Sequence, residues 1–213
     1  MGYFSGQFSN DNVYFLMSRL IKNNKKILFD QELSKKILGR LVGQLEELGS
    51  SDIRKSFVFH LITLLTSYHN KAIRRNQNMI FDYFIKNGEN WLYSNLKRMR
   101  FIAFIRNYSS FYYDSRKHNI PKDTKFVALP AKLCTIISII QLVNQCNKGG
   151  NSFVTSISEK IISLEHIKKL LEQRLPIPIK IVFLNYIKRI YLDNIDELEE
   201  YEFNEYFALF ESL

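Results

Sequence analysis

Apolar residues recur every three to four positions along most of this chain, and that spacing constrains the fold more than any other feature. The first example lies in residues 11–24. Its apolar residues at this spacing are Val13, Leu16, Met17, Leu20 and Ile21. One face of an amphipathic helix collects such positions and buries them. No alternation of apolar and polar residues bounded by turn residues occurs, so we expect essentially no β-sheet. The sequence therefore predicts an all-α fold.

Residues that start and stop helices divide the chain into successive segments. Asp11, Asp30, Ser51 and Ser163 are predicted N-caps, and Gly49 is predicted to stop the second helix. The predicted helices cover residues 11–24, 30–48, 51–70, 71–86, 90–95, 98–116, 130–145, 163–171 and 178–190. Residues 152–158 are ambiguous and fit a short helix, and an acidic, aromatic segment closes the chain.

Burial patterns predict which of these helices lies at the centre. Residues 130–145 are apolar on most faces, so we expect a fully buried central helix there. Pro130 and Pro178 suit first helical turns, because proline lacks an N–H that such positions leave unpaired. In residues 71–86, one face carries Ile73, Gln77, Ile80 and Phe84. The last predicted helix buries Ile179, Val182, Phe183, Tyr186, Ile187 and Ile190.

Length and composition fit one block of packed helices. The chain has 213 residues, of which 46% are hydrophobic and 24% charged, as is typical of globular domains. Glycine (8) and proline (4) are scarce, which favours long helices with short connections. We expect residues 1–213 to form a single helical-repeat block, an armadillo- or HEAT-like array (an α-solenoid) of about 9–11 helices. Apolar residues near both ends indicate that the block is part of a larger protein.

The net charge of +9 is unevenly distributed. Residues 193–213 contain no Lys or Arg, and their acidic members are Asp193, Asp196, Glu197, Glu199, Glu200, Glu202, Glu205 and Glu211. The rest of the chain is therefore strongly basic, a property that suits nucleic acid or anionic lipid. Because the basic residues are scattered rather than clustered, a solvated surface is favoured over a specific anion site.

Cysteine usage and hydropathy bear on the compartment of the chain. Cys134 and Cys146 are the two cysteines, and their spacing on one helix corresponds to about 18 Å of rise. A disulfide needs Cα atoms within about 7 Å, so we expect free, buried thiols in a reducing compartment. No run of about 18 apolar residues occurs, so we expect a soluble segment without a membrane span. The start of the chain matches neither a signal peptide nor a myristoylation pattern.

The sequence offers no recognisable catalytic or cofactor-binding pattern. The histidines are His60, His69, His118 and His166. His60 and His69 lie on the helix predicted over residues 51–70, about 13 Å apart by helical rise, whereas metal ligation on a helix favours residues three or four apart. Glycine-rich phosphate loops and nucleophile motifs are also missing. We therefore predict that the chain is not an enzyme and has no metal or cofactor, and that each histidine has a structural or surface role.

Basic strings occur at several places in the predicted helices. They lie at residues 22–26, 54–56, 74–75 and 97–100. Such strings could bind phosphate groups, and aromatic residues near the last string would also suit nucleic acid. The helical spacing favours the simpler interpretation, in which the charges are solvated and the aromatic rings pack in the core.

Four strings within residues 72–199 share their order and spacing with a known family. They are "IRRNQNMIFDYFIKNGENWL", "RMRFIAFIRNYSSFYYDSR", "TIISIIQLVNQCNKGGN" and the pair "SLEHIKKLL" and "IPIKIVFLNYIKRIYLDNIDELEE". Their co-linear helices, stops and turns resemble the cytosolic helical-repeat (RIH-type) region of inositol trisphosphate receptors, in the family that includes ryanodine receptors. The chain departs from that pattern in carrying more Lys, Asn and aromatic residues, which suggests a distant member. No motif for the family's ligand or calcium residues matches.

The resemblance implies a non-catalytic cytosolic scaffold segment of an intracellular ligand-gated calcium-release channel. In that family, helical arrays relay ligand binding to a pore, which would lie outside this chain. Such a relay needs a packed element with alternative arrangements rather than a reactive residue. The implied partners are other domains or subunits of the channel, and not nucleic acid. The implied location is the cytosolic face of the endoplasmic reticulum or a related calcium-store membrane.

A second resemblance leads to a different function. The strings "SFVFHLITLLTSYHN" and "FIRNYSSFYYDSR" are similar to ANTH-type clathrin-adaptor domains, helical solenoids that bind phosphoinositides through a lysine cluster. The nearest equivalent here is the looser set Lys22, Lys25 and Lys26, which lacks the histidine found in those domains. These lysines are the candidate anion or phosphoinositide contacts. A general helical scaffold for protein–protein contacts is the third interpretation.

Overall fold

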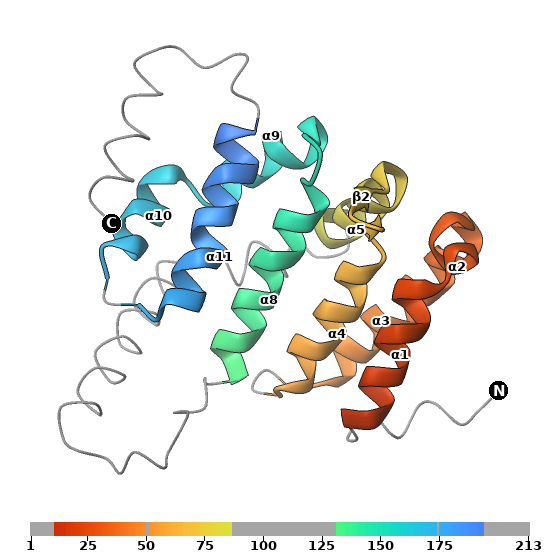
Figure 1. Ribbon diagram of the computed structural model, residues 1–213. Helices are drawn as coiled ribbons and strands as arrows, with labels where there is room; N and C mark the ends of the chain where they lie inside the picture. Colours follow the sequence, from red (N-terminus) through yellow and green to blue (C-terminus); the bar gives the residue numbers. More distant parts are fainter. Residues whose placement is uncertain (1–10, 50–51, 87–130, 174, 194–213) are drawn as a thin grey trace, which may run out of the picture.

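The computed structural model describes residues 11–49, 52–86, 131–173 and 175–193 (Figure 1). Within them lie nine α-helices, one π-helical turn and one two-stranded hairpin. In chain order the elements are α1 (Asp11–Asn23), α2 (Lys25–Phe29), α3 (Gln31–Glu47), α4 (Arg54–Leu64), β1 (Ser67–Tyr68), β2 (Lys71–Ala72), α5 (Arg74–Lys86), α8 (Ala131–Cys146), α9 (Ser152–Ile161), α10 (Leu164–Leu171), α11 (Ile177–Ile187) and η1 (Lys188–Leu192). The prediction of a mainly helical chain is confirmed. The helices predicted at residues 90–95 and 98–116, and the acidic end, lie outside the described residues.

The longest row of helices consists of α1, α4, α8 and α11, which lie side by side in that order (Figure 1). Behind this row, α3 packs against α4 and α5, and α9 packs against α5 and α8. α10 contacts α11 at the far end of the row from α1. Each helix therefore buries its apolar side mainly against its immediate neighbours.

α8 lies at the centre of the described helices. It contacts α4 on one side, α11 on the other, and α5 and α9 behind (Figure 1). Its buried residues are Leu133, Thr135, Ile136, Ile139, Ile140, Leu142, Val143, Asn144 and Cys146. This distribution covers most faces of the helix, so its predicted central position is confirmed. The helix is not fully buried as predicted, because Lys132 and Gln141 are exposed. Since a fully buried Leu or Ile contributes about 1.5–3 kcal/mol, α8 supplies a large share of the core stability.

The inward faces predicted for the two flanking segments are confirmed. Ile73, Gln77, Ile80 and Phe84 are buried on or beside α5. On α11 and η1, the buried residues are Ile179, Val182, Phe183, Tyr186, Ile187 and Ile190. The Tyr186 hydroxyl donates to the Ser158 carbonyl oxygen at 2.8 Å, which satisfies a polar group that the core would otherwise leave unpaired. Pro178 lies in the first turn of α11, as predicted.

Helix caps agree with the sequence at two positions and add a helix at a third. Asp30 accepts from the Leu33 N–H at 3.0 Å, and Ser163 caps α10. Asn24 accepts from the Ile27 N–H at 3.1 Å and so caps α2, a five-residue helix that the sequence analysis missed. Gly49 follows the end of α3, as predicted, while Ser51 lies outside the described residues.

The helix predicted over residues 51–70 is wrong at its C-terminal end. α4 stops at Leu64, and β1 and β2 then form an antiparallel hairpin, so the expectation of essentially no sheet misses a short ladder. His69 and Asn70 form its turn with φ angles of 44° and 63°. Histidine and asparagine tolerate this left-handed region better than most residues, and two such residues in succession suit a tight hairpin. His60 and His69 therefore do not share a helix.

The inward face predicted for α1 is wrong for Leu16 and Leu20, which are 55% and 51% exposed. Ile21 on the same helix is buried, and Met17 packs against the core. The cause is the position of α1 at the end of its row, where α4 covers only one side (Figure 1). The apolar stripe of α1 is therefore wider than the surface that α4 covers.

Both cysteines lie on α8, and they form no disulfide with each other, as predicted. Cys146 is buried, but Cys134 is only half-buried, so the prediction of two buried thiols holds for one of them. In the part of the chain that the structure describes, every helix is too short or too polar to cross a membrane.

Candidate functional site

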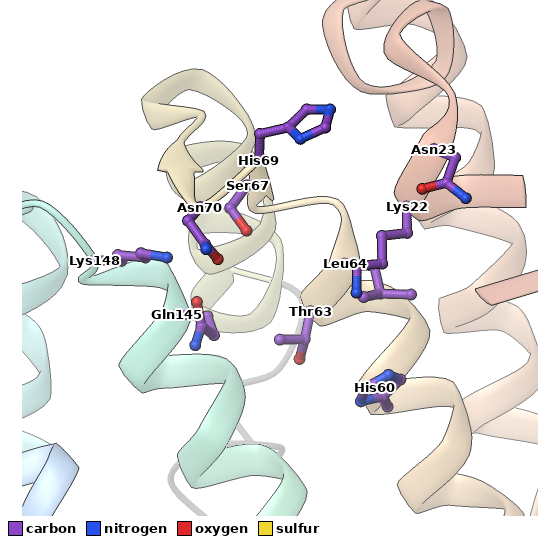
Figure 2. A pocket seen from close by; sticks show the side chains of 10 residues that line it. All are labelled: Lys22, Asn23, His60, Thr63, Leu64, Ser67, His69, Asn70, Gln145 and Lys148. Atoms are coloured by element: carbon purple, nitrogen blue, oxygen red, sulfur yellow. The ribbon is translucent and has the colours of Figure 1, made fainter. Parts of the chain in front are cut away.

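A polar pocket of about 410 Å³ opens between α1, α4, the hairpin and the end of α8 (Figure 2). Four basic side chains line it: Lys22 from α1, His60 from α4, His69 from the hairpin turn, and Lys148 just after α8. Among the described residues, no aspartate or glutamate lines this pocket. We name it the basic pocket. Its charge and its N–H groups suit a negatively charged ligand.

Neutral polar groups complete the lining of the basic pocket. Asn23, Asn70 and Gln145 contribute carboxamides, and Thr63 and Ser67 contribute hydroxyls. Lys22 extends from α1 toward α4, and Lys148 extends from the end of α8 toward the hairpin (Figure 2). Neither ammonium group forms an ion pair within the described ranges of the chain. Among the described residues, both charges are therefore without a carboxylate partner.

His60 stands at the centre of this polar surface. Desolvation by the pocket wall lowers the pKa of its imidazole, and the nearby charge of Lys22 lowers the pKa further. Its ring centroid lies 5.8 Å from that of Tyr14 on α1. The lowered pKa favours the neutral imidazole, in which one ring nitrogen donates a hydrogen bond and the other accepts one.

A second pocket of about 610 Å³ continues the basic pocket toward α11. His60, Thr63 and Gln145 line both pockets. Arg189 lines the second one, but its guanidinium donates to the Asp193 carboxylate at 2.9 Å, so this charge is already paired. The unpaired positive charge of the polar surface is thus concentrated in the basic pocket.

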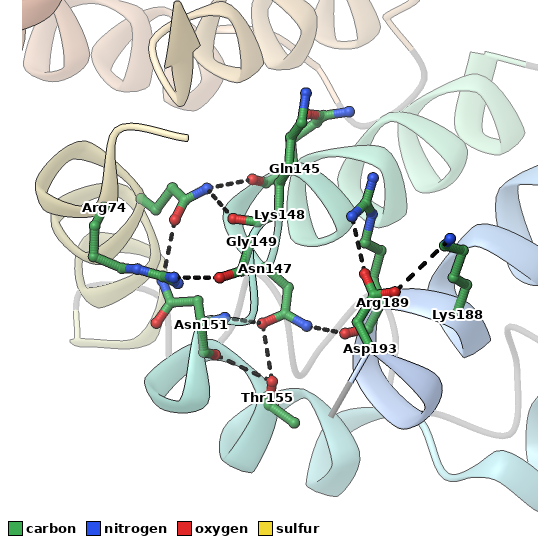
Figure 3. Close-up of polar contacts among 11 residues, drawn as sticks. Arg74, Gln145, Asn147, Lys148, Gly149, Asn151, Thr155, Lys188, Arg189 and Asp193 are labelled. Atoms are coloured by element: carbon green, nitrogen blue, oxygen red, sulfur yellow. Dashed lines mark hydrogen bonds and ion pairs between the residues drawn. The ribbon is translucent and has the colours of Figure 1, made fainter. Parts of the chain in front are cut away.

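A set of side chains from α5 fixes the end of α8, which carries Gln145 and Lys148 (Figure 3). The Gln77 carboxamide donates to the Gln145 carbonyl at 2.9 Å and to the Lys148 carbonyl at 3.1 Å. The Arg74 guanidinium donates to the Gly149 carbonyl at 2.6 Å. Helix ends leave carbonyl groups without intrahelical partners, and these bonds satisfy them. One wall of the basic pocket is therefore held by bonds remote from it in sequence.

Two asparagines extend this junction to α9 and η1 (Figure 3). The Asn147 side-chain oxygen accepts from the Asn151 N–H at 3.1 Å and from the Thr155 hydroxyl at 2.9 Å. Its nitrogen donates to the Arg189 carbonyl. The Asn151 nitrogen donates to the Cys146 carbonyl at 3.1 Å and to the Asn78 side-chain oxygen at 2.8 Å. Four elements, α5, α8, α9 and η1, thus meet at one buried polar cluster.

A similar clamp lies on the other side of α5. The buried Asn76 nitrogen donates to the Leu28 carbonyl at 2.8 Å and to the Leu65 carbonyl at 3.0 Å. These carbonyls belong to the end of α2 and to the residue after α4. Neighbouring positions on α5 therefore bind opposite parts of the molecule.

Of the three lysines that the sequence analysis proposed as anion contacts, the structure places one in the basic pocket and two outside it. Lys22 lines the basic pocket, whereas Lys25 and Lys26 are exposed on α2 and are not among its lining residues. The sequence analysis assigned His60 and His69 to structural or surface roles and gave Lys148 no role. It missed their proximity because they belong to three separate elements. The only local sequence signal was a turn residue next to two of these side chains: Asn70 follows His69, and Gly149 follows Lys148.

Comparisons of this chain with family models, with curated proteins and with solved structures find no match. Within the described residues, no group of three His, Cys, Asp or Glu side chains is placed to hold a metal ion. A functional interpretation therefore depends on the helical arrangement, the exposed surfaces and the basic pocket.

Proposed function

We propose that this chain is a non-catalytic helical scaffold, built as an α-solenoid of the armadillo or HEAT kind, that packs against other parts of a larger assembly. The exposed apolar face of α1 is the observation that carries this proposal. Phe15, Leu16 and Leu20 are 54%, 55% and 51% exposed on one helix. In a stacked array each helix buries its apolar sides against its neighbours, so this face suits a further layer of protein.

The larger assembly that we propose is an intracellular calcium-release channel at a calcium-store membrane. Support comes from the sequence resemblance. Within the described residues its strings include α5, α10, α11, η1 and most of α8, while the string at residues 98–116 lies outside the described residues. The residues of these strings make packing contacts and the polar junction around Gln77 and Asn147. That junction links four elements, so a displacement of one would be passed to the others. A relay of ligand binding toward a pore requires this kind of coupling.

The proposal is tested on the protein in its native cells. The chain is tagged at its own locus, and the membrane fraction is examined by native gel electrophoresis. We expect an assembly far larger than the 25.3 kDa of the chain, and calcium release from the same membranes on addition of inositol trisphosphate. A free 25.3 kDa species in the supernatant would contradict the proposal.

A pair of double variants tests the α1 face directly. Leu16→Glu with Leu20→Glu places charge on that face and should release the chain from the assembly, because an unpaired buried carboxylate is strongly unfavourable. Phe29→Glu with Ile53→Glu changes two apolar residues of similar exposure, 48% and 41%, outside α1. This control should remain assembled. Equal behaviour of the two double variants would argue against α1 as the contact surface.

An ANTH-type phosphoinositide adaptor is the alternative function. The position of Lys22 in the basic pocket supports it, whereas Lys25 and Lys26 lie outside that pocket. Flotation with phosphoinositide vesicles tests this alternative. Binding that depends on all three lysines would favour the adaptor over the scaffold.

A further inference from the structure

We propose that the basic pocket binds the phosphate group of a small phosphorylated molecule. This inference is independent of the scaffold function, since it depends only on the pocket formed by α1, α4, the hairpin and the end of α8. The phosphate could belong to a free metabolite or to a lipid headgroup. The chemistry of the pocket is the same for both.

The charge and donor pattern of the pocket is the first argument. Lys22 and Lys148 approach from opposite walls without carboxylate partners in the described residues (Figure 2). His69, Asn70 and Gln145 also line the pocket and carry N–H donors. Phosphate oxygens accept hydrogen bonds from several donors at once, and bonds to charged donors are the strongest. A neutral or cationic ligand would leave both ammonium groups unmatched.

The size of the pocket is the second argument. A volume of about 410 Å³ lies within the range of roughly 300–1,000 Å³ that is usual for small-molecule sites. The pocket is bounded by four elements rather than lying on one flat helix face. It therefore suits a compact phosphorylated molecule better than a nucleic-acid strand, which needs an extended basic surface.

The fixed geometry of its walls is the third argument. Gln77 and Arg74 hold the backbone of residues 145–149, which carries the Lys148 side chain. On the hairpin, the two-residue turn between β1 and β2 holds the backbone of His69 and Asn70 at positive φ angles. Groups that are positioned before a ligand arrives lose less conformational freedom on binding.

Two probes distinguish the sources of the phosphate. Isothermal titration calorimetry with sodium pyrophosphate tests a free anion, and co-sedimentation with phosphatidylcholine vesicles, with and without a phosphoinositide, tests a headgroup. Saturable binding of pyrophosphate supports a soluble ligand. Binding to phosphoinositide vesicles alone supports a lipid ligand. Absence of binding to both probes overturns the proposal.

A matched pair of variants separates the pocket from general surface charge. Lys22→Gln with Lys148→Gln should weaken binding by on the order of tenfold or more, because two charged contacts are lost. Lys25→Gln with Lys26→Gln removes the same charge from exposed positions outside the pocket and should change affinity less than about twofold. Circular dichroism and the melting temperature confirm that all variants are folded. Equal weakening in the two double variants overturns the proposal.

Discussion

The side-chain nitrogen of Gln77 lies 2.9 Å from the backbone carbonyl oxygen of Gln145, although 68 positions separate the two residues in the chain. The same nitrogen donates to the Lys148 carbonyl at 3.1 Å, so one side chain of α5 closes the end of α8. Gln77 is fully buried, and water therefore cannot replace it at these carbonyls. The placement of Lys148 in the basic pocket consequently depends on a residue outside that pocket.

Replacing Gln77 by leucine should lower the free energy of unfolding by about 1–3 kcal/mol, because the Lys148 carbonyl loses its side-chain donor and the Gln145 carbonyl keeps only the Lys148 N–H at 3.3 Å. Urea unfolding measures the change. Gln173→Leu is the matched control: its carboxamide donates to the Lys169 carbonyl at 3.0 Å on an exposed turn. Water can replace that bond, so this variant should lose less than about 0.5 kcal/mol. Equal losses of unfolding free energy in the Gln77→Leu and Gln173→Leu variants would show that burial does not strengthen the hydrogen bonds of Gln77.

Two glycine-to-alanine changes should have opposite signs. Gly149 has a φ of +82°, and a left-handed conformation costs an alanine about 1–2 kcal/mol, so Gly149→Ala should destabilise. The added Cβ would lie 3.6 Å from the Cβ of Ala72, an ordinary contact, which leaves the backbone as the cause. Gly39 lies within α3 with open space around it, and Gly39→Ala should stabilise by about 0.5–1 kcal/mol. Thermal unfolding measures the change in stability of each variant. A change of the same sign in both variants would contradict this account.

The two thiols should differ in reactivity. Burial raises the pKa of both Cys134 and Cys146, but Cys146 is fully buried and Cys134 only half-buried. The thiolate is the reactive form, so iodoacetamide should label Cys134 faster by on the order of tenfold or more in the folded protein. Peptide mass spectrometry follows each site, and denaturant should equalise the two rates. Preferential labelling of Cys146 in the folded protein would contradict the packing of α8.

Tyr186 should make the protein sensitive to alkali. Burial, followed by the neighbouring Tyr191, raises the pKa of the Tyr186 phenol well above its ordinary 10.0. The folded state therefore keeps a proton that the unfolded state loses above pH 10. This contribution to stability is complete below the unfolded pKa and is lost as pH rises toward the folded pKa.

The variant Tyr186→Phe isolates this effect. At pH 8 it should be less stable by about 0.5–1.5 kcal/mol, because the bond to the Ser158 carbonyl is gone. As pH rises above 10, the parent protein should lose stability more steeply, and the difference between the two should shrink. Urea unfolding at several pH values measures both trends. A constant difference across this range would mean that Tyr186 is not the group responsible.

Several parts of the fold could be predicted because their signals are local. The run from Ile136 to Val143 is apolar at all positions except Ser138 and Gln141, which places α8 in the core. Ser163 and Pro178 mark helix starts through the hydrogen-bonding and ring geometry of single residues. Each of these features acts within one or two helical turns.

Other parts could not be predicted because they depend on distant partners. Periodicity gives an apolar stripe on α1, but it does not reveal that α4 covers only one side and leaves Leu16 and Leu20 exposed. The hairpin turn at His69 and Asn70 interrupts a stretch whose apolar spacing continues the helical pattern. The basic pocket unites Lys22 with Lys148 only through the packing of α1, α4 and α8.

The hydrogen bonds of Asn76 and Gln77 reach different parts of the molecule, and this has a mechanical consequence. Consecutive residues on an α-helix point about 100° apart around its axis, and here one holds the ends of α2 and α4 while the other holds the end of α8. Turning α5 about its own axis would therefore pull on both halves of the molecule at once. A load on the ends of α2 and α4 would therefore reach the end of α8 by rotation of α5, in addition to the direct packing of α4 against α8.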